Sequence, residues 1–266
     1  MRIKSINPKK PLIGTKISVE KNEHLFSGCA HDCKYCYAKA TAIQHKKNTT
    51  DDWKNEVVKN RSLFKKKCQK IESTIMFPST HDITPKNLVQ NLICLHNYVY
   101  VGNKILIVSK PHMECIESIC HVFSSTKDSI RFRFTIGSAD SDTLQYWEPN
   151  APDFNERLES LKYAFNAGYA TSVSCEPMLD DKVDQVIYKV FPYVTETILL
   201  EKPNRLIERL SMNGFKNDQS VMNQAHKLMG LFSDEYILNL YERYQANPKI
   251  MWKDSIKKVF KRYKID

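Results

Sequence analysis

Glycine is scarce in this chain of 266 residues, which contains only 7. That number excludes a collagen-like protein and a glycine-rich linker. No stretch approaches the roughly 20 consecutive apolar residues that a membrane-spanning helix needs, and the best candidate, residues 88–101, is interrupted by Gln90, Asn91, His96 and Asn97. The first ten residues, MRIKSINPKK, have no apolar core of signal-peptide length. We therefore expect a cytoplasmic protein with no membrane partner.

Acidic residues are fewer than basic ones, 30 Asp and Glu against 40 Lys and Arg, which gives a formal net charge of +10. Basic residues concentrate in the first 21 residues and in segments 54–70 and 253–266. Such a balance favours a polyanionic partner, DNA or RNA, and the three lysines 65–67 are candidate phosphate contacts. A solvated basic surface is the commoner explanation of the same charge. Hydrophobic residues make up 42% of the chain, enough for a sizeable core.

Short β-rich runs alternate with helical patterns through the middle of the chain. The expected strands are residues 23–27, 73–77, 104–108, 131–136, 171–174 and 197–200. Thr84 and Pro85 indicate a helix start, and helices are expected over residues 88–99, 154–167 and 183–190. This alternation predicts parallel strands joined by right-handed crossovers, in an open barrel or a doubly wound sheet. The pattern after residue 218 is mostly helical.

Eight cysteines in a cytosolic chain indicate a metal site and buried thiols, not a disulfide framework. Three of them, Cys29, Cys33 and Cys36, lie in the segment GCAHDCKYCYA at the spacing C-x3-C-x2-C. Three thiolates that bind one metal centre leave its fourth coordination position open. A zinc site would more often use two separated pairs, and His24 or His31 would have to complete it. An iron–sulfur cluster with one iron not bound by cysteine fits better.

The motif C-x3-C-x-aromatic-C, with Tyr35 as its aromatic residue, resembles that of the radical S-adenosylmethionine (SAM) superfamily. The resemblance implies an α/β fold, a partial (β/α)6 TIM-type barrel, and a [4Fe–4S] cluster held by Cys29, Cys33 and Cys36. It implies that SAM chelates the fourth iron and that an electron donor such as flavodoxin or ferredoxin reduces the cluster. SAM is then cleaved to a 5′-deoxyadenosyl radical that abstracts hydrogen from a substrate.

A closer resemblance is to the branch related to spore photoproduct lyase, described as DNA-repair-photolyase-like. It rests on the cysteine segment, on Lys110 in VSKP, and on the stretch EPNAP at 148–152 followed by ERL at 156–158. The likeness spans residues 23–204 and implies a nucleic-acid substrate. Alternatives are a radical SAM enzyme acting on a peptide or another molecule, and a zinc-stabilised nucleic-acid-binding module without catalysis.

The resemblance also divides the chain into three parts. Residues 1–22 are expected to be an N-terminal extension and residues 23–215 the radical SAM core. Residues 216–266 are expected to be a mostly helical C-terminal extension packed on that core.

The candidate SAM contacts lie after the expected strands, where folds of this kind place their active sites. Together with Tyr35 they are Ser79 and Thr80 for the amino group, Ser138 and Asp140 for the ribose, Arg157 for the carboxylate, and Glu176, Lys202 and Asn204. Each has a structural alternative: Ser138 and Asp140 would cap a helix, Arg157 would pair with Glu148, and Lys202 would be a surface cation.

Ser79 marks a departure from the lyase pattern. Spore photoproduct lyase uses a cysteine after its second strand as a hydrogen donor, and in this chain the corresponding residue is Ser79. A hydroxyl O–H bond is much stronger than a thiol S–H bond, so serine is a poor substitute. The sequence therefore predicts that repair of the spore photoproduct is inefficient.

Overall fold

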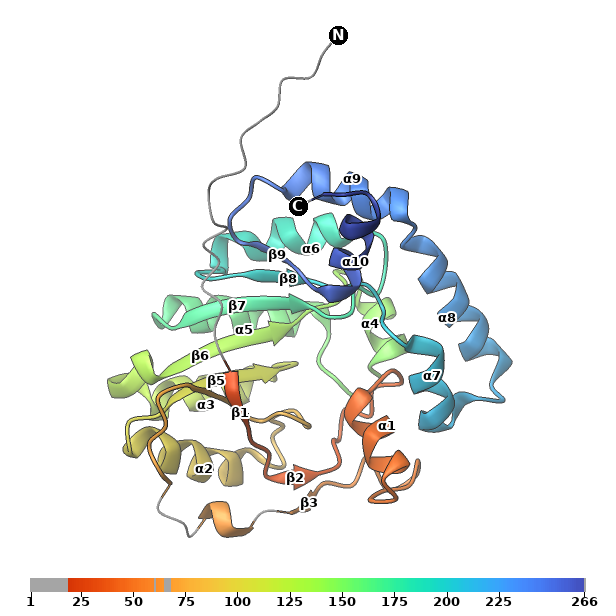
Figure 1. Ribbon diagram of the computed structural model, residues 1–266. Helices are drawn as coiled ribbons and strands as arrows, with labels where there is room; N and C mark the ends of the chain where they lie inside the picture. Colours follow the sequence, from red (N-terminus) through yellow and green to blue (C-terminus); the bar gives the residue numbers. More distant parts are fainter. Residues whose placement is uncertain (1–18, 60, 65–67, 266) are drawn as a thin grey trace.

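Seven parallel strands form one sheet in the computed structural model, which describes residues 19–59, 61–64 and 68–265. The strands are β1 (Val19–Asn22), β4 (Thr74–Met76), β5 (Lys104–Ser109), β6 (Ile130–Thr135), β7 (Ala170–Cys175), β8 (Ile198–Leu200) and β9 (Ile250–Trp252), in that order across the sheet (Figure 1). Every connection leads to the adjacent strand in one direction, as in an open barrel, whereas a doubly wound sheet reverses at a switch point. The predicted α/β partial barrel is confirmed.

Helices fill the crossovers between these strands. The longer ones are α1 (Tyr37–Gln44), α2 (Leu88–Tyr100), α3 (Met113–Val122), α4 (Ser141–Trp147), α5 (Phe154–Asn166), α6 (Val183–Val190), α8 (Gln219–Leu231), α9 (Asp234–Tyr244) and α10 (Asp254–Arg262). Shorter segments are α7 (Leu206–Leu210), the 3₁₀ turns η1 (Arg61–Phe64), η2 (Ser124–Ser129) and η3 (Phe191–Tyr193), and the π-helical turn η4 (Ser211–Phe215). The C-terminal ends of the strands point towards α1, α4 and α7 (Figure 1). No described helix has the length and hydropathy to span a membrane.

Strand β6 shows how the sheet separates a packed face from a polar one. Ile130, Phe132 and Phe134 are fully buried in the hydrophobic core, where Phe132 packs edge-on against Tyr169. The alternating residues 131, 133 and 135 are Arg, Arg and Thr, and they are only partly buried. Because side chains alternate across a strand, all three lie on the opposite, inner face of the sheet. The inner face near β6 is therefore polar.

The first strand differs from the prediction of residues 23–27. β1 is Val19–Asn22, and Phe26–Ser27 form β2, which pairs antiparallel with β3 (Val57–Val58) in a separate two-stranded sheet. Between them the backbone changes partner, since the Glu23 amide donates to the Met76 carbonyl while the Leu25 carbonyl accepts from the Lys59 amide. The expected boundary between the N-terminal extension and the core, at residue 22, thus falls after the first strand of the sheet.

The C-terminal segment is mostly helical, as expected, but it also contains one strand that was not predicted. Its strand β9 pairs with β8 and adds a seventh parallel strand to the six expected. Trp252 of β9 packs against Tyr241 and Phe260, which come from α9 and α10. A strand of three residues is too short to show an alternating pattern, which is why the sequence gives no signal for it.

One helix start was also misplaced. The expected start at Thr84 and Pro85 lies before the first turn of α2, which begins at Leu88. The Thr84 amide instead donates to the side chain of Asn87, 2.9 Å away.

Candidate metal and cofactor site

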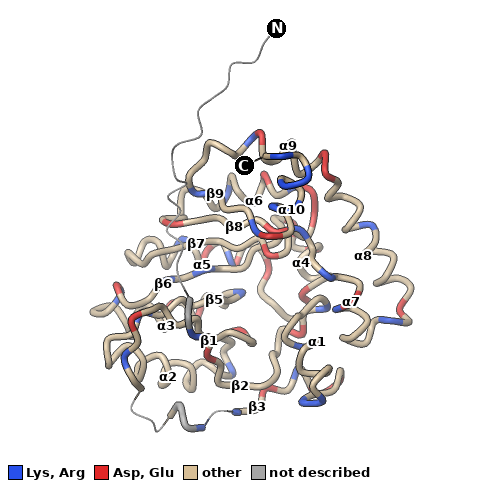
Figure 2. The backbone as a smooth tube through the Cα atoms, in the orientation of Figure 1, with Lys and Arg blue, Asp and Glu red and all other residues tan. Residues whose placement is uncertain are grey.

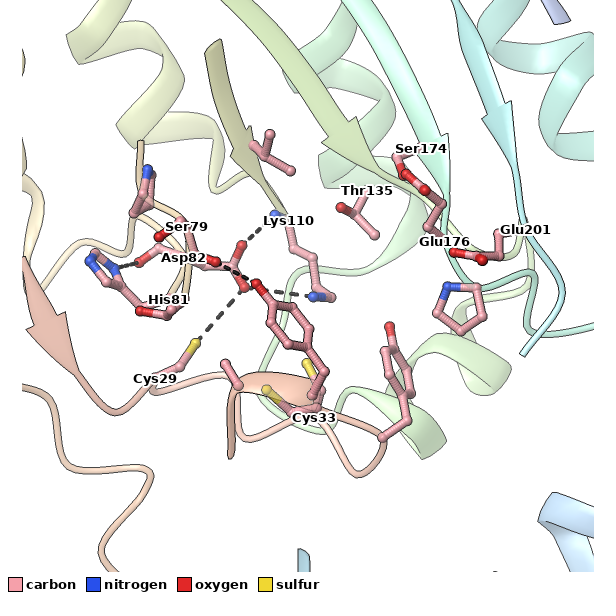
Figure 3. Close-up of a pocket in the computed structure, with 18 of the residues that line it drawn as sticks. Cys29, Cys33, Ser79, His81, Asp82, Lys110, Thr135, Ser174, Glu176 and Glu201 are labelled. Carbon is pink, nitrogen blue, oxygen red and sulfur yellow. Dashed lines mark hydrogen bonds and ion pairs between the residues drawn. The ribbon is translucent and has the colours of Figure 1, made fainter. Parts of the chain in front are cut away.

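A cavity of about 370 Å³ opens at the C-terminal ends of the strands (Figure 3). Its lining includes most of the residues predicted from the sequence. They are Cys29, Cys33, Tyr35, Cys36, Ser79, Thr80, Glu176, Lys202 and Asn204. Ser138, Asp140 and Arg157 are not among the lining residues. The structure therefore brings nine of the twelve predicted residues to one place.

The cysteines lie in the segment 28–36, called here the cysteine loop, between β2 and α1. Gly28 has φ +93°, and a Cβ atom there would lie 2.6 Å from the carbonyl oxygens of Trp53 and Asn55. Only glycine fits this turn. The Cys29 amide donates to the Trp53 carbonyl, and Cys36 is the N-cap residue of α1. The loop is thus anchored at both ends.

The chemistry of the three thiols fits a metal centre. Burial raises the pKa of Cys29, Cys33 and Cys36, so without a cation they remain protonated. A bound metal centre offsets this cost by stabilising thiolates. The three sulfur atoms are not all within 4.8 Å of one another. Zinc bonds of about 2.3 Å would bring them to roughly 3.8 Å, so the spacing suits a larger cluster better than a single ion.

His31 is not available as a fourth zinc ligand. Cys29, His31 and Asp82 lie within 4.8 Å of one another. This proximity reflects hydrogen bonds: His31 Nδ1 is 2.8 Å from Asp82 and Nε2 is 2.9 Å from His112 Nε2. Both ring nitrogens are already engaged, which disfavours the zinc alternative that depends on this histidine.

Asp82 joins the cysteine loop to two strands. It follows β4, and its Oδ1 accepts hydrogen bonds from the Lys110 amide at 2.8 Å and the Ser109 hydroxyl at 3.0 Å, both at the end of β5. Its Oδ2 faces His31 of the cysteine loop. Although burial favours the neutral acid, Lys110 and His31 hold the pKa of Asp82 well below its usual value. No sequence pattern points to this residue beyond its place after a strand.

Arg157 requires a correction, because it does not face the cavity. Its guanidinium is fully buried, pairs with Glu148, and donates to the carbonyls of Pro152 and Thr135 at 2.8 and 3.1 Å. The Tyr35 hydroxyl donates to the same Glu148. The EPNAP segment and Arg157 therefore hold the aromatic residue of the cysteine motif, and Arg157 itself is fully buried and does not line the cavity.

Ser138 and Asp140 are also committed elsewhere. The Ser138 hydroxyl is fully buried and donates to Asp180, while Asp140 is the N-cap of α4 and accepts from the amides of Asp142 and Thr143. Both residues follow β6 as expected. Asp140 thus caps a helix, as the alternative explanation expected, and the Ser138 hydroxyl also accepts from the Asp140 amide at 2.9 Å. Neither side chain lines the cavity, and the ribose contact stays a prediction.

Lys110 is the cation on the cysteine side of the cavity. It lines the cavity, and its Nζ lies 3.7 Å from Asp82 Oδ2. Burial opposes the charged form, but Asp82 together with Cys33, Tyr35 and Glu148 raises the pKa of Lys110. Figure 3 shows Lys110 between Asp82 and Cys33 on one side and Thr135 and Glu176 on the other.

The opposite wall carries two carboxylates. Glu176 accepts from the Ser174 hydroxyl and pairs with Lys253 at 2.9 Å. Burial and the nearby Glu176 raise the pKa of Glu201. Lys253 follows β9, so the C-terminal segment contributes to this wall. That contribution was missed because β9 was not predicted.

Ser79 lies where the sequence placed it, after β4 at the edge of the cavity. Its hydroxyl is 3.5 Å from His24 Nδ1, and its carbonyl accepts from the Tyr37 hydroxyl at 2.6 Å. Thr80 is next to it, and Lys202 and Asn204 line the cavity from the loop after β8.

Asn213 holds the cysteine loop from a distant part of the chain. It is 2% exposed in the π-helical turn η4, and its amide donates to the carbonyls of Lys34 and Cys36 at 2.9 and 3.0 Å. π-helical turns occur frequently at functional sites. A partner 177 residues away leaves no local pattern, so sequence reasoning could not find it.

Comparisons with known proteins agree with the fold. No protein-family model and no curated protein matches the chain. Solved structures of spore photoproduct lyase do. A cysteine-to-alanine variant has a TM-score of 0.54 and 14% identity over 95% of this chain and 88% of its own. Another variant, with bound AdoMet (SAM) and dinucleoside spore photoproduct, has a TM-score of 0.54 and 15% identity over 92% and 79%.

The chain has the fold of spore photoproduct lyase. A further lyase structure, complexed with dinucleoside spore photoproduct, matches with a TM-score of 0.53 and 14% identity over 90% of this chain. The resemblance predicted from the cysteine motif is thereby confirmed at the level of the fold.

We expect Asn213→Asp to loosen the cysteine loop, because it replaces two donated hydrogen bonds by a carboxylate facing two carbonyls. The free energy of unfolding should fall by about 1–3 kcal/mol. Amide hydrogen exchange over residues 34–39 should accelerate. Asn223→Asp, the same change at an exposed position of α8, is the control. Equal exchange in the two variants would contradict the assignment of Asn213 as a positioning residue.

His81 predicts a pH dependence of stability. Burial lowers its pKa to about 4, and its ring accepts from the Leu25 amide and donates to the Asp82 carbonyl in the neutral form. The unfolded chain binds this proton at a pKa near 6.5, so His81 destabilises the folded state progressively from about pH 6.5 to pH 4, by roughly 3 kcal/mol in total. His81→Asn should remove this part of the pH dependence in urea titrations, whereas exposed His226→Asn should retain it.

Proposed function

We propose that this chain is a radical SAM enzyme that holds a [4Fe–4S] cluster and acts on a nucleic-acid substrate. One observation carries the proposal. Three cysteines from one loop, two of them buried and Cys36 partly buried, line a cavity at the C-terminal ends of a partial barrel, and the same fold occurs in a lyase structure with bound AdoMet. An electron donor such as flavodoxin or ferredoxin would supply the reducing equivalent.

The residues of the cavity divide into two groups in this proposal. Cys29, Cys33 and Cys36 would hold the cluster. Tyr35, Ser79, Thr80, Glu176, Lys202 and Asn204 remain candidates for SAM, and Lys110 replaces Arg157 as the partner of its carboxylate, because Lys110 lines the cavity beside the cysteines. When bound, the cluster and SAM supply a 5′-deoxyadenosyl radical for hydrogen abstraction. Asp82 orients Lys110, and Glu148 orients Tyr35.

The size of the cavity limits how a substrate can enter it. About 370 Å³ is near the lower end of the range for small-molecule sites, roughly 300–1,000 Å³. With a cofactor bound, only a small group of the substrate fits, so the rest must lie outside. A nucleic acid meets this condition when one base leaves the stack. Lys202 and Arg209 also line the cavity, and their positive charges favour a polyanion.

Charge on the rest of the surface is less specific. Figure 2 shows basic residues distributed over many elements of the described chain, not gathered along one of them. The lysines 65–67, proposed from the sequence as phosphate contacts, lie outside the described residues. A polyanionic substrate is therefore supported mainly by Lys202 and Arg209, which line the cavity.

The substrate is proposed to differ from the spore photoproduct. Among the described residues that line the cavity, the only thiols are those of Cys29, Cys33 and Cys36, which the cluster would use. Cys175 is fully buried and does not line the cavity. With Ser79 in place of the lyase cysteine, no thiol is left there to return hydrogen to a product radical.

Replacing any one of Cys29, Cys33 and Cys36 by Ala should abolish SAM cleavage, because each supplies one thiolate to the same cluster. Anaerobically reconstituted wild-type protein should bind about four irons and release 5′-deoxyadenosine with dithionite and SAM. Cys94→Ala, a fully buried thiol on α2, is the control and should lose stability but keep cleavage. Wild-type protein that binds one zinc and no iron would support the zinc module instead.

Binding to a single-stranded oligonucleotide should weaken by roughly tenfold or more between about 50 and 200 mM salt, as a few phosphate contacts require. Exchanging Lys202 and Arg209 together for Gln should flatten this dependence in fluorescence anisotropy titrations. The exposed pair Lys182 and Lys227, exchanged for Gln, should leave it unchanged. Negligible affinity at low salt would favour a peptide or another non-nucleic-acid substrate.

A further inference from the structure

Two arginines on the inner face of β6 have different surroundings. Arg131 and Arg133 are two residues apart on one strand, so their side chains lie on the same face. Arg131 pairs with Glu196, with 3.2 Å between nitrogen and oxygen. Arg133 has no carboxylate within 4.0 Å in the described part of the chain. Its one hydrogen bond is from Nε to the Ser172 hydroxyl, at 3.4 Å.

Arg133 lines the cavity, and Arg131 does not. Burial lowers the pKa of Arg133 more than the nearby Glu176 and Glu196 raise it. Barrels of this type usually fill their interior with branched apolar side chains. An arginine held there without an ion-pair partner carries a desolvation cost that the nearby Glu176 and Glu196 offset only in part. The two terminal nitrogens of its guanidinium are donors for a molecule in the cavity.

Two other charged groups of the cavity, Lys110 and Glu176, have ion-pair partners. Lys110 pairs with Asp82, and Glu176 pairs with Lys253 at 2.9 Å. Glu176 is therefore paired with Lys253 and makes no ion pair with Arg133, whose charge it compensates only in part. The neighbour of Arg133 on the same face is Thr135, the last residue of β6, whose hydroxyl is a second donor in the lining.

We propose that Arg133, with Thr135, forms an anion subsite that binds a phosphate group of the substrate. The planar guanidinium presents paired donors that match the oxygens of a phosphate. The choice of phosphate rests on the proposed nucleic-acid substrate. Arg133 thus acts as a specificity-determining residue for a nucleotide that enters the cavity.

The carboxylate of SAM is the other source of an oxyanion. In the proposed function this carboxylate would lie near the cluster, where Lys110 lines the cavity beside Asp82 and the cysteines. Figure 3 shows Thr135, the inner-face neighbour of Arg133, on the other side of Lys110 from Asp82. Because Lys110 would bind the carboxylate of SAM, Arg133 is assigned to the substrate.

The test uses the full chain, reconstituted anaerobically and saturated with SAM, and inorganic phosphate as the probe in calorimetric titrations. Arg133→Met should weaken phosphate binding by about tenfold or more, while its affinity for SAM stays within a factor of two or three of the wild type. Arg131→Met, on the same strand and face, is the matched control and should bind phosphate like the wild type. Arg133→Gln serves if the Met variant does not fold.

Two results would overturn the subsite. One is equal phosphate affinity in the wild type and both Arg133 variants. The other is a tenfold loss of SAM affinity in Arg133→Met together with competition between phosphate and SAM, which would assign the anion to the cofactor. Release of 5′-deoxyadenosine by the wild type is measured separately. Its absence would refute the proposed function and leave the phosphate result standing.

Discussion

The carboxylate of Asp82 is the interaction on which the site depends. It is buried after β4, and it binds the end of β5 through the Lys110 amide and the Ser109 hydroxyl and the cysteine loop through His31. A buried carboxylate is stable only when such partners surround it. Its charge therefore fixes three segments relative to one another. Because Lys110 and the cysteines are oriented by the same group, a change at Asp82 would disturb both together.

The cysteine loop has two further anchors on its other side. Glu148, paired with the buried Arg157, accepts from Tyr35, and Asn213 donates to the backbone at Lys34 and Cys36. Such ion pairs contribute little net stability, because the desolvation of the charges offsets their attraction. Their effect here is geometric. Three separate parts of the chain hold one loop, as a metal centre with fixed ligand positions requires.

Sequence reasoning identified what local patterns encode. The spacing of Cys29, Cys33 and Cys36 lies within eight residues, and the strands before the predicted contacts are short β-rich runs. The direction of a side chain after a strand is set by tertiary contacts instead. The resemblance assigned Arg157 to the cofactor, yet its guanidinium is buried against Glu148 and two carbonyls. Asn213 and β9 were missed because their partners are remote or their pattern is too short.

The two walls of the cavity also differ in how their charges are paired. On the cysteine side, Asp82 and Lys110 neutralise each other, which would suit the proposed cluster with its charged ligands. On the opposite wall, Glu176 is matched by Lys253 and Arg133 is left without a carboxylate. A partly buried cation without an ion-pair partner carries a desolvation cost, which a bound anion would lower. The imbalance therefore lies on the wall away from the cysteines, where a substrate would complete it.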